Sequence, residues 1–246
     1  MKAKGFFAII PVKGTITAEG SFFGLVSTSS DILWAIEDAE KRKKIKGVIF
    51  EINSPGGTPF AAKEVAMRIK TMEKPTIAWI REYATSGAYW IASACDEIVA
   101  DELSTVGSIG VMSIRPDIGE LLKKFGIDVE TLKTGIYKGL GLPYEKPTEE
   151  ERALLTKELD EIKNVFLTAI AENRRLNEAT VEELATAKVY LGREAKDLGL
   201  VDHLGGREEA VKSAKERSGV KREKLLNYGE RRRRGFLRRL IEELLW

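Results

Sequence analysis

The sequence predicts an α/β fold, because short strand-like runs alternate with helical patterns along the chain. The strand-like runs are rich in β-branched and aromatic residues, and the helical patterns carry apolar residues three or four positions apart. The chain has 246 residues, of which 43% are hydrophobic, so it can fill a sizeable core without disulfides or metals. These observations favour α/β layering over two unrelated domains.

The first half of the chain contains the clearest strand and helix signals. Residues 6–16 predict a first pair of strands. The spacing of Leu33, Ile36 and Ala39 predicts a helix. Residues 48–52 form a run with β-branched ends that is typical of a buried parallel strand.

The second half continues the pattern. Residues 76–80 and 98–100 predict further strands, and Thr148 with Glu151 predicts a capping box that opens a long helix. The same pair of residue types recurs from Thr180 and predicts another helix start. The long helix carries an apolar stripe at helical spacing, made of Leu155, Leu159, Ile162, Phe166 and Ile170.

Charge and composition exclude several classes of function. The chain has 40 Lys and Arg against 38 Asp and Glu, a net charge of +2, which gives no chain-wide basic field for nucleic-acid binding. A single cysteine, Cys95, and a single histidine, His203, exclude an intrachain disulfide and a cysteine-rich zinc site. We therefore expect no metal, no organic cofactor and no nucleic-acid partner.

The turn at residues 53–57, which reads NSPGG, is the first candidate for chemistry. It follows the predicted strand, and Thr58 with Pro59 then suits a helix start. Its paired glycines let backbone N–H groups face a ligand, which is how an oxyanion would be held. The alternative is a plain turn between a strand and a helix.

Ser86 is the second candidate. It lies in the segment ATSGA, where a strand gives way to a helix of small residues, much as a nucleophile elbow presents a hydroxyl group. Alanines at Ala84 and Ala88 occupy the positions that are glycine in that motif, so a helix-capping serine is the competing interpretation.

Lys138 is the third candidate. It follows Tyr137 in a loop of small residues. A lysine that is buried can lose its proton near neutral pH and then deprotonate a serine. The competing interpretation is a solvated surface charge, which is the usual state of a lysine.

Taken together, the motifs of the chain resemble those of the S49 serine peptidases, the signal peptide peptidase A family, from about residue 6 to residue 214. The matching motifs occur in order along the chain: NSPGG at residues 53–57, SGAYWIA at 86–92, VGSIGV at 106–111, KTGIYK at 133–138, and VYLGR at 189–193, leading into GLVD at 199–202. The resemblance implies a ClpP/crotonase-like fold of repeated ββα units with a helical C-terminal extension. It also implies a serine endopeptidase with a Ser/Lys dyad.

The resemblance assigns roles to individual residues. Ser86 matches the nucleophile, and Lys138, 52 positions later, matches the general base. The backbone N–H groups of Gly57 and Gly87 match the oxyanion hole. Ser108 matches the hydroxyl that orients the lysine, although a turn serine that bonds its own backbone is an equal interpretation.

Partners and substrates also follow from the resemblance. It implies cleavage of peptides, among them cleaved signal peptides and other small hydrophobic peptides. It further implies a ring-like homo-oligomer in which the serine and the lysine that meet come from neighbouring protomers. The chain departs from the family pattern at Ala88, where a second glycine is usual.

Three alternatives remain open at the level of sequence. A Ser/His/Asp enzyme on the same fold would need His203, and a crotonase-type acyl-CoA enzyme would need glutamates such as Glu82 and Glu102. The third alternative is a catalytically inactive scaffold that binds peptides or membranes. A peptide-hydrolysis assay separates the scaffold from an enzyme.

The C-terminal region differs in character from the rest of the chain. Residues 230–246 contain six arginines against three glutamates. Their apolar residues recur at helical spacing. We therefore predict a peptidase domain over residues 1–215 and a basic amphipathic helical tail over residues 216–246. The tail suits an anionic membrane surface, a neighbouring subunit or the active-site groove.

The N-terminus carries no obvious targeting signal. Residues 5–12 are apolar but far shorter than the roughly 20 residues that span a bilayer, and no signal-peptide cleavage pattern follows. The expectation is a cytoplasmic or peripheral membrane-associated protein, unless an N-terminal anchor has been removed.

Overall fold

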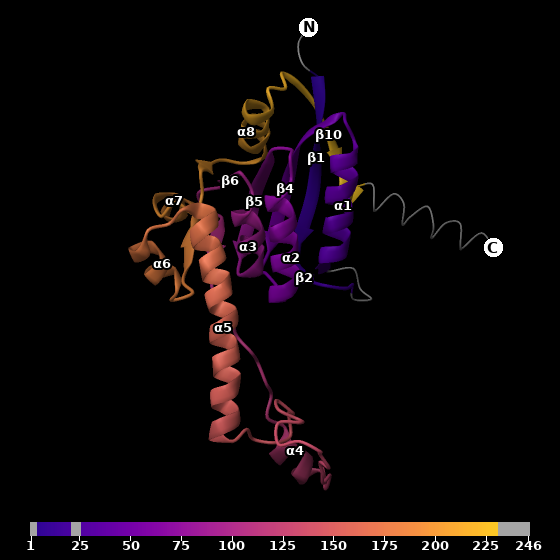
Figure 1. Ribbon diagram of the computed structural model, residues 1–246, viewed down its shortest axis with the longest axis vertical. Coiled ribbons are helices and arrows are strands. Elements are labelled where there is room, and N and C mark those ends of the chain that lie inside the picture. Colours follow the sequence, from indigo (N-terminus) through magenta and orange to yellow (C-terminus); the bar gives the residue numbers. More distant parts are fainter. Residues whose placement is uncertain (1–3, 21–25, 231–246) are drawn as a thin grey trace, which may run out of the picture. The chain divides into compact units, whose positions relative to one another are not determined.

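Figure 1 shows a mixed α/β architecture in the computed structural model, which describes residues 4–20 and 26–230. The strands are β1 (Lys4–Lys13), β2 (Thr15–Thr17), β3 (Val26–Thr28), β4 (Ile45–Ser54), β5 (Thr76–Thr85), β6 (Glu97–Ala100), β7 (Thr105–Gly107), β8 (Val189–Leu191), β9 (His203–Leu204) and β10 (Arg222–Asn227). The helices are α1 (Ser29–Lys41), α2 (Pro59–Lys70), α3 (Gly87–Ser93), α4 (Gly119–Lys124), α5 (Glu149–Arg174), α6 (Glu178–Leu184), α7 (Gly192–Asp197) and α8 (Arg207–Ser218). Within the described ranges, no helix combines the length and the apolar character that a membrane crossing requires.

The chain divides into two compact units. The first unit runs up to Gly110 and resumes at Phe166, and the second is Val111–Val165. The main sheet, with the helices packed on it, belongs to the first unit. The second unit contains α4 and the N-terminal part of α5.

The main sheet is parallel except at one pair of strands. Its order is β10-β1-β4-β5-β6-β9, and β7 pairs in parallel with β5 and antiparallel with β8. β4 is buried along nearly its whole length, as expected for a parallel strand that is covered on both faces. The prediction of a buried parallel strand at residues 48–52 is therefore confirmed.

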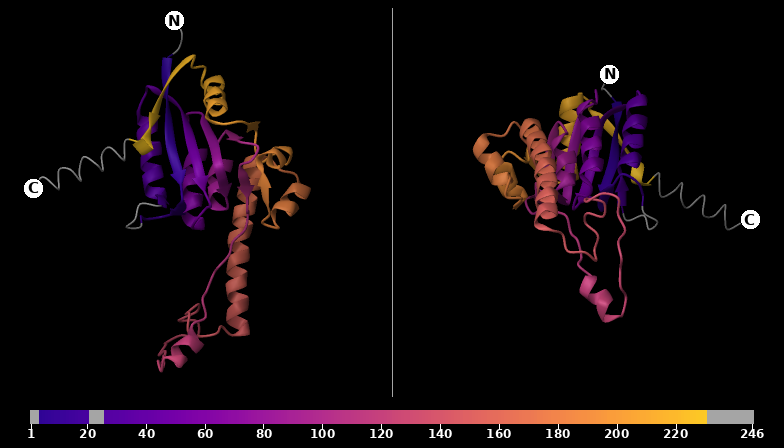
Figure 2. Two further views of the ribbon diagram at one scale, coloured as in Figure 1. Left: turned by 180° about the vertical axis from the view of Figure 1, so that it is seen from behind. Right: turned by 60° about the horizontal axis from the view of Figure 1, so that its bottom comes forward.

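Alternate side chains of the sheet point into two hydrophobic clusters. In β1, Ala8, Ile10 and Val12 belong to the larger cluster, whereas Phe7 and Ile9 belong to the smaller one. The larger cluster includes buried residues of α1, α2 and α3, and these helices lie together on one side of the sheet (Figures 1 and 2). Alanines of α8 close the smaller cluster. This layering is the α/β arrangement that the alternating pattern predicts.

The two strands predicted over residues 6–16 form, but they do not pair with each other. β1 lies beside β4 in the main sheet, while β2 pairs with β3 in a separate two-stranded sheet. Gly14, with φ of 67°, turns the chain between them. A bridge joins Ile16 of β2 to Gly57, so β2 lies beside the turn that follows β4.

The long helix α5 begins where the sequence predicts it. The Thr148 N–H donates to the Glu151 carboxylate at 2.9 Å, and the Glu151 N–H donates to the Thr148 hydroxyl at 3.1 Å, so the capping box is confirmed. Within α5, which is described in full, the buried residues are Phe166 and Ile170. Burial of the predicted apolar stripe is therefore confined to the part of α5 that belongs to the first unit.

A stacked aromatic pair attaches that part of α5 to α3. The rings of Trp90 and Phe166 lie 4.5 Å apart with an interplanar angle of 16°. Replacing Phe166 with leucine keeps most of the buried volume and removes the ring contact, so we expect a loss of about 1 kcal/mol in the free energy of unfolding. Urea denaturation measures this loss. Val165→Ala, at an exposed neighbouring position, should change stability by less than about 0.5 kcal/mol, and an equal loss in both variants would contradict a role for the stack.

Two helix starts differ in detail from the sequence prediction. Thr58 is the N-cap of α2 and Pro59 its first residue, as predicted, but among the described residues the Thr58 hydroxyl makes no capping hydrogen bond. α6 begins before Thr180, because the Asn177 side chain accepts the Thr180 N–H at 2.9 Å. Asparagine is at least as good an N-cap as threonine, so the helix starts at the earlier residue.

The α/β domain also continues beyond the predicted boundary at residues 215 and 216. That boundary falls inside α8, which ends at Ser218, and β10 then pairs in parallel with β1 from Lys4 opposite Arg222 to Ile9 opposite Asn227. Residues 216–227 therefore belong to the sheet and its covering layer instead of a helical tail. Residues 231–246 lie outside the described residues, so the amphipathic tail stays a prediction.

The second unit exposes an unusual amount of apolar surface. Of residues 111–165, all of which are described, none is buried. Leu132 is 89% exposed, and Met112, Ile114, Phe125 and Ile136 are also largely exposed. Large exposed apolar surfaces are common where a protein interacts with another molecule.

Candidate active site

Ser86 lies at the point where β5 ends and α3 begins. Its backbone adopts φ of 53° and ψ of −131°, a conformation that residues other than glycine rarely adopt. The Ser86 N–H donates to the Gly107 carbonyl at 2.8 Å, and the Ser86 carbonyl accepts the Tyr89 N–H at 2.9 Å. The turn is therefore sharp and held from both sides, which presents the serine at the end of the sheet.

The glycine turn after β4 packs directly against Ser86. A Cβ atom added to Gly56 would lie 2.8 Å from the Ser86 Cβ and 2.9 Å from the Gly87 nitrogen. One added to Gly57 would lie 1.9 Å from the Ile16 carbonyl oxygen. Since side chains would collide at both positions, glycine is required for this close approach of three backbone segments.

Gly57 and Gly87 lie next to each other, as an oxyanion hole requires. A Cβ atom added to Gly87 would lie 3.6 Å from the Gly57 nitrogen. The bridge between β2 and this turn uses the Gly56 carbonyl, which accepts the Ile16 N–H, and the Thr58 N–H, which donates to the Ile16 carbonyl. The Gly57 N–H is not used in that bridge. Two backbone N–H groups beside a serine are what stabilises the developing charge in acyl transfer.

Ser108 follows Gly107, the residue whose carbonyl accepts the Ser86 N–H. It also has a positive φ, 53°, and its N–H donates to the Lys188 carbonyl at 2.9 Å. The structure thus brings Ser86, Gly57, Gly87 and Ser108 together in the first unit.

Lys138 belongs to the second unit. Its N–H donates to the Gly135 carbonyl at 3.0 Å in a turn, and its side chain is exposed. The neighbouring Tyr137 hydroxyl donates to the Glu150 carboxylate at 2.6 Å. Its own turn therefore leaves the lysine side chain in contact with solvent.

Comparison with known proteins places this chain in a family. The sequence model of peptidase family S49 matches residues 68–221, which include Ser86, Gly87, Ser108 and Lys138. The chain belongs to peptidase family S49. A second model, the N-terminal domain of NfeD1b, matches residues 8–119.

Individual relatives agree with the S49 assignment. The chain is 36% identical over 202 residues to a putative protease of Methanocaldococcus jannaschii, covering 81% of this chain and 65% of the relative. It is 33% identical to the putative signal peptide peptidase SppA of Enterococcus faecium, covering 84% of this chain and 62% of the relative. It is 32% identical to the chloroplastic serine protease SPPA of Arabidopsis thaliana, covering 87% of this chain and 31% of the relative. The chain thus spans less than two thirds of the length of each of these relatives.

A lysine that the sequence analysis did not select lies in the first unit of this S49 chain. The Lys188 amine is 2.8 Å from the Glu194 carboxylate and 4.8 Å from the centroid of the Tyr190 ring. The hydrogen bond to Glu194 raises the pKa of Lys188. A lysine that is held as a cation is a poor general base, which disfavours that role for Lys188. Its position directly before the VYLGR motif is the sequence signal that could have drawn attention to Lys188.

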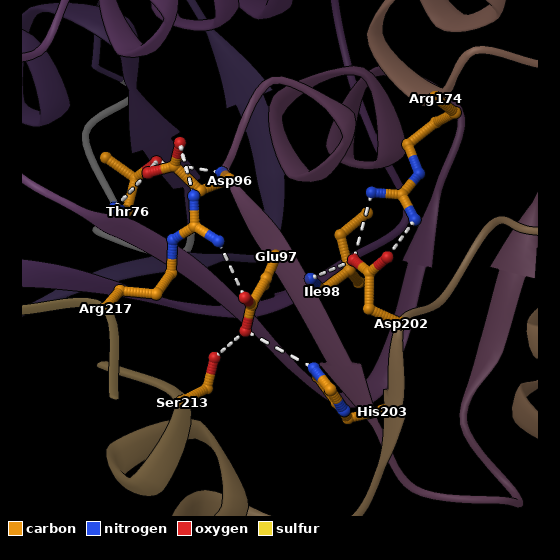
Figure 3. A network of polar contacts seen from close by, with 9 residues as sticks. All are labelled: Thr76, Asp96, Glu97, Ile98, Arg174, Asp202, His203, Ser213 and Arg217. Carbon is orange, nitrogen blue, oxygen red and sulfur yellow. Dashed lines mark hydrogen bonds and ion pairs between the residues drawn. The ribbon is translucent and has the colours of Figure 1, made fainter. Parts of the chain in front are cut away.

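His203, the histidine of the alternative mechanism, belongs to a different network (Figure 3). Its Nε2 lies 3.3 Å from the Glu97 carboxylate, and its side chain is 43% exposed. Glu97 also accepts hydrogen bonds from Ser213 and Arg217 of α8. His203 therefore lies among groups that hold α8 on the sheet, as expected of a partly exposed structural histidine.

The glutamates of the crotonase-type alternative also have structural partners. The Glu102 carboxylate accepts a hydrogen bond from Arg193 at 2.6 Å, and the Glu82 carboxylate contacts the Asn53 amide at 3.5 Å. Within the described ranges, no group of three or more His, Cys, Asp or Glu side chains is arranged to hold a metal ion.

Proposed function

We propose that this S49 chain is a serine endopeptidase in which Ser86 is the nucleophile and Lys138 the general base. The observation that carries the proposal is the strained turn at Ser86, which packs against Gly56 and places Gly87 next to the Gly57 nitrogen. The proposal includes a ClpP/crotonase-like fold of repeated ββα units, which the parallel sheet with helices after β4 and β5 supports.

The reaction follows from the roles of these groups. The neutral Lys138 amine accepts the Ser86 hydroxyl proton as Oγ attacks the scissile carbonyl. The Gly57 and Gly87 N–H groups donate to the resulting oxyanion. The C–N bond then breaks, and the lysine gives its proton to the leaving amine. Water attacks the acyl-enzyme in the same way, which releases the second peptide and regenerates Ser86.

A homo-oligomer would complete this site. We propose that a ring-like assembly brings Lys138 of one protomer to Ser86 of a neighbouring protomer and desolvates the lysine there. The exposed apolar side chains of the second unit support this proposal, because a neighbouring subunit would cover them. A head-to-tail interface between identical chains closes into a ring when the rotation permits it.

The proposed substrates are cleaved signal peptides and other small hydrophobic peptides. The name of the Enterococcus relative, a putative signal peptide peptidase, supports this class. An extended peptide would add to a sheet edge beside the site, so that main-chain hydrogen bonds give affinity and small pockets give selectivity. The basic tail at residues 231–246 would bring the enzyme to membrane-derived substrates or contact a neighbouring subunit.

Covalent labelling together with a panel of fluorogenic peptides tests the proposed activity. A fluorophosphonate should modify Ser86, identified by mass spectrometry of the intact full-length chain and its fragments. Peptides with apolar residues before the scissile bond should be cleaved faster than peptides with acidic ones. Ser113→Ala, which changes an exposed serine of the second unit, should retain both activities. Peptide binding without turnover, with Ser86 unmodified, would instead support the inactive scaffold.

A further inference from the structure

We propose that β8, together with Lys188 before it, positions the Ser86 nucleophile by fixing Gly107 and Ser108. This inference rests on the proposed role of Ser86. It gives a function to the VYLGR motif at residues 189–193, which so far has none. Tyr190 is the central side chain in the proposal, and it acts through Gly107 without touching substrate.

Gly107 contacts the proposed nucleophile through the backbone. β5 and β7 pair in parallel with Thr85 opposite Gly107, and the hydrogen bond from the Ser86 N–H to the Gly107 carbonyl, 2.8 Å long, extends this pairing by one residue. Ser86 is held there in a backbone conformation that is costly for any residue other than glycine. Such a conformation persists only where the surroundings enforce it, so a displacement of Gly107 would change the direction of the Ser86 side chain.

Gly107 is itself closely enclosed. Its φ is 107°, and an added Cβ atom would lie 2.7 Å from the Lys188 carbonyl oxygen and 3.0 Å from a ring carbon of Tyr190. The Lys188 carbonyl also accepts the Ser108 N–H at 2.9 Å. The backbone of Lys188 and the ring of Tyr190 thus occupy the space beside Gly107 and leave its peptide little freedom to move.

β8 is in turn attached to the rest of the sheet. β8 pairs antiparallel with β7, with Tyr190 opposite Val106, and Tyr190 is only 1% exposed. At the end of the motif, an added Cβ atom at Gly192 would lie 2.0 Å from the Asp101 carbonyl oxygen, so the chain after β8 packs closely on the segment after β6. β8 is therefore attached at both ends of the motif and can transmit this rigidity to Gly107.

The side chains of β8 provide a matched set of variants. Tyr190 is buried against Gly107, whereas its neighbour Leu191 is about half exposed. Tyr190→Ala and Tyr190→Leu both remove the ring, and leucine leaves a larger apolar side chain in its place. Tyr190→Phe keeps the ring, and Leu191→Ala shortens a side chain of the same strand that lies opposite Thr105 instead of Gly107.

The experiment measures kcat, KM, the rate of fluorophosphonate modification of Ser86 and the melting temperature for each variant of the full-length protein. Tyr190→Ala and Tyr190→Leu should lower kcat and the modification rate together by about 10- to 100-fold, since a displacement of about 1 Å costs that much. KM should change by less than about 3-fold. Tyr190→Phe and Leu191→Ala should stay within about 3-fold of the wild type in all kinetic values.

Two results would overturn the inference. One is wild-type kcat and modification rate in Tyr190→Leu at a temperature where that variant is folded. The other is a loss in Leu191→Ala as large as that in Tyr190→Leu, which would indicate general destabilisation of the strand. If Tyr190→Ala does not fold, Tyr190→Leu carries the test. Failure of the proposed function is distinct, because the wild type itself would then show no modification of Ser86.

Discussion

Ser86→Ala and Lys138→Ala should each lower kcat for a fluorogenic peptide by about 10⁴-fold or more, while the melting temperature stays that of the wild type. Both residues take part in one proton transfer, so the double variant should be no worse than either single one. Lys138→Arg should fail equally, because a guanidinium group does not give up its proton. Steady-state kinetics with circular dichroism as the control for folding measure these effects.

A lysine of the same unit provides the matched control. Lys133 is exposed, like Lys138, and lies five positions earlier in the same motif. Lys133→Ala should keep kcat within about 3-fold of the wild type if the effect at Lys138 is chemical. Near-normal turnover of Lys138→Ala, or a dead His203→Ala variant, would show that another residue is the base.

Mixing the two inactive variants tests whether the dyad forms between subunits. In a ring whose sites combine Ser86 of one protomer with Lys138 of its neighbour, a mixture of Ser86→Ala and Lys138→Ala chains contains some sites with both native residues. Activity should therefore return on mixing and subunit exchange. Subunit exchange must first be verified. If activity then does not return, or if light scattering shows an active monomer, the dyad forms within one chain.

Arg174→Leu should lower the free energy of unfolding by about 3–5 kcal/mol. The Arg174 side chain is only 8% exposed, and its guanidinium donates to both carboxylate oxygens of Asp202 (Figure 3). It also donates to the Gly199 carbonyl. Asp202 also accepts the Ile98 N–H at 2.7 Å, so this network joins the end of α5 to β6. Without the arginine, a partly buried carboxylate is left without its cation.

Urea denaturation measures the effect, with Arg152→Leu as the control because Arg152 is an exposed arginine of the same helix. Arg152→Leu should change stability by less than about 0.5 kcal/mol. The double variant Arg174→Leu with Asp202→Asn should lose less free energy of unfolding than the sum of the losses in the two single variants, since the pair acts as a unit. A loss below about 1 kcal/mol in Arg174→Leu would mean that Asp202 is adequately solvated without its partner.

Features that depend on neighbouring residues were predictable from the sequence. The Thr148 and Glu151 capping box forms as predicted, because it needs only a hydroxyl and a carboxylate three positions apart. The buried strand at residues 48–52 also forms, because β-branched residues favour extended backbone that is covered on both faces. The start of α6 was missed because Asn177 and Thr180 are both acceptable caps, and local preference does not decide strongly between them.

Features that join distant segments were decided by the tertiary structure. β10 lies beside β1 although more than 200 residues separate them, and the pattern of either strand does not specify its neighbour. The tertiary structure likewise decided which residues of the apolar stripe of α5 are buried. Helical spacing identifies its apolar face, but contact with α3 at Trp90 selects which part of that face is covered.

The candidate site also combines features that the sequence predicts with features that only folding decides. The sequence by itself determined which residue types are available: a serine after a strand, a glycine pair in a turn, and a lysine whose role rests on family resemblance. Only the tertiary structure showed that Ser86 adopts a positive φ, that Gly56 has no room for a side chain beside it, and that Gly107 accepts its N–H. The reason is physical, because local propensity acts over a few residues whereas strain and close packing depend on segments brought together by folding.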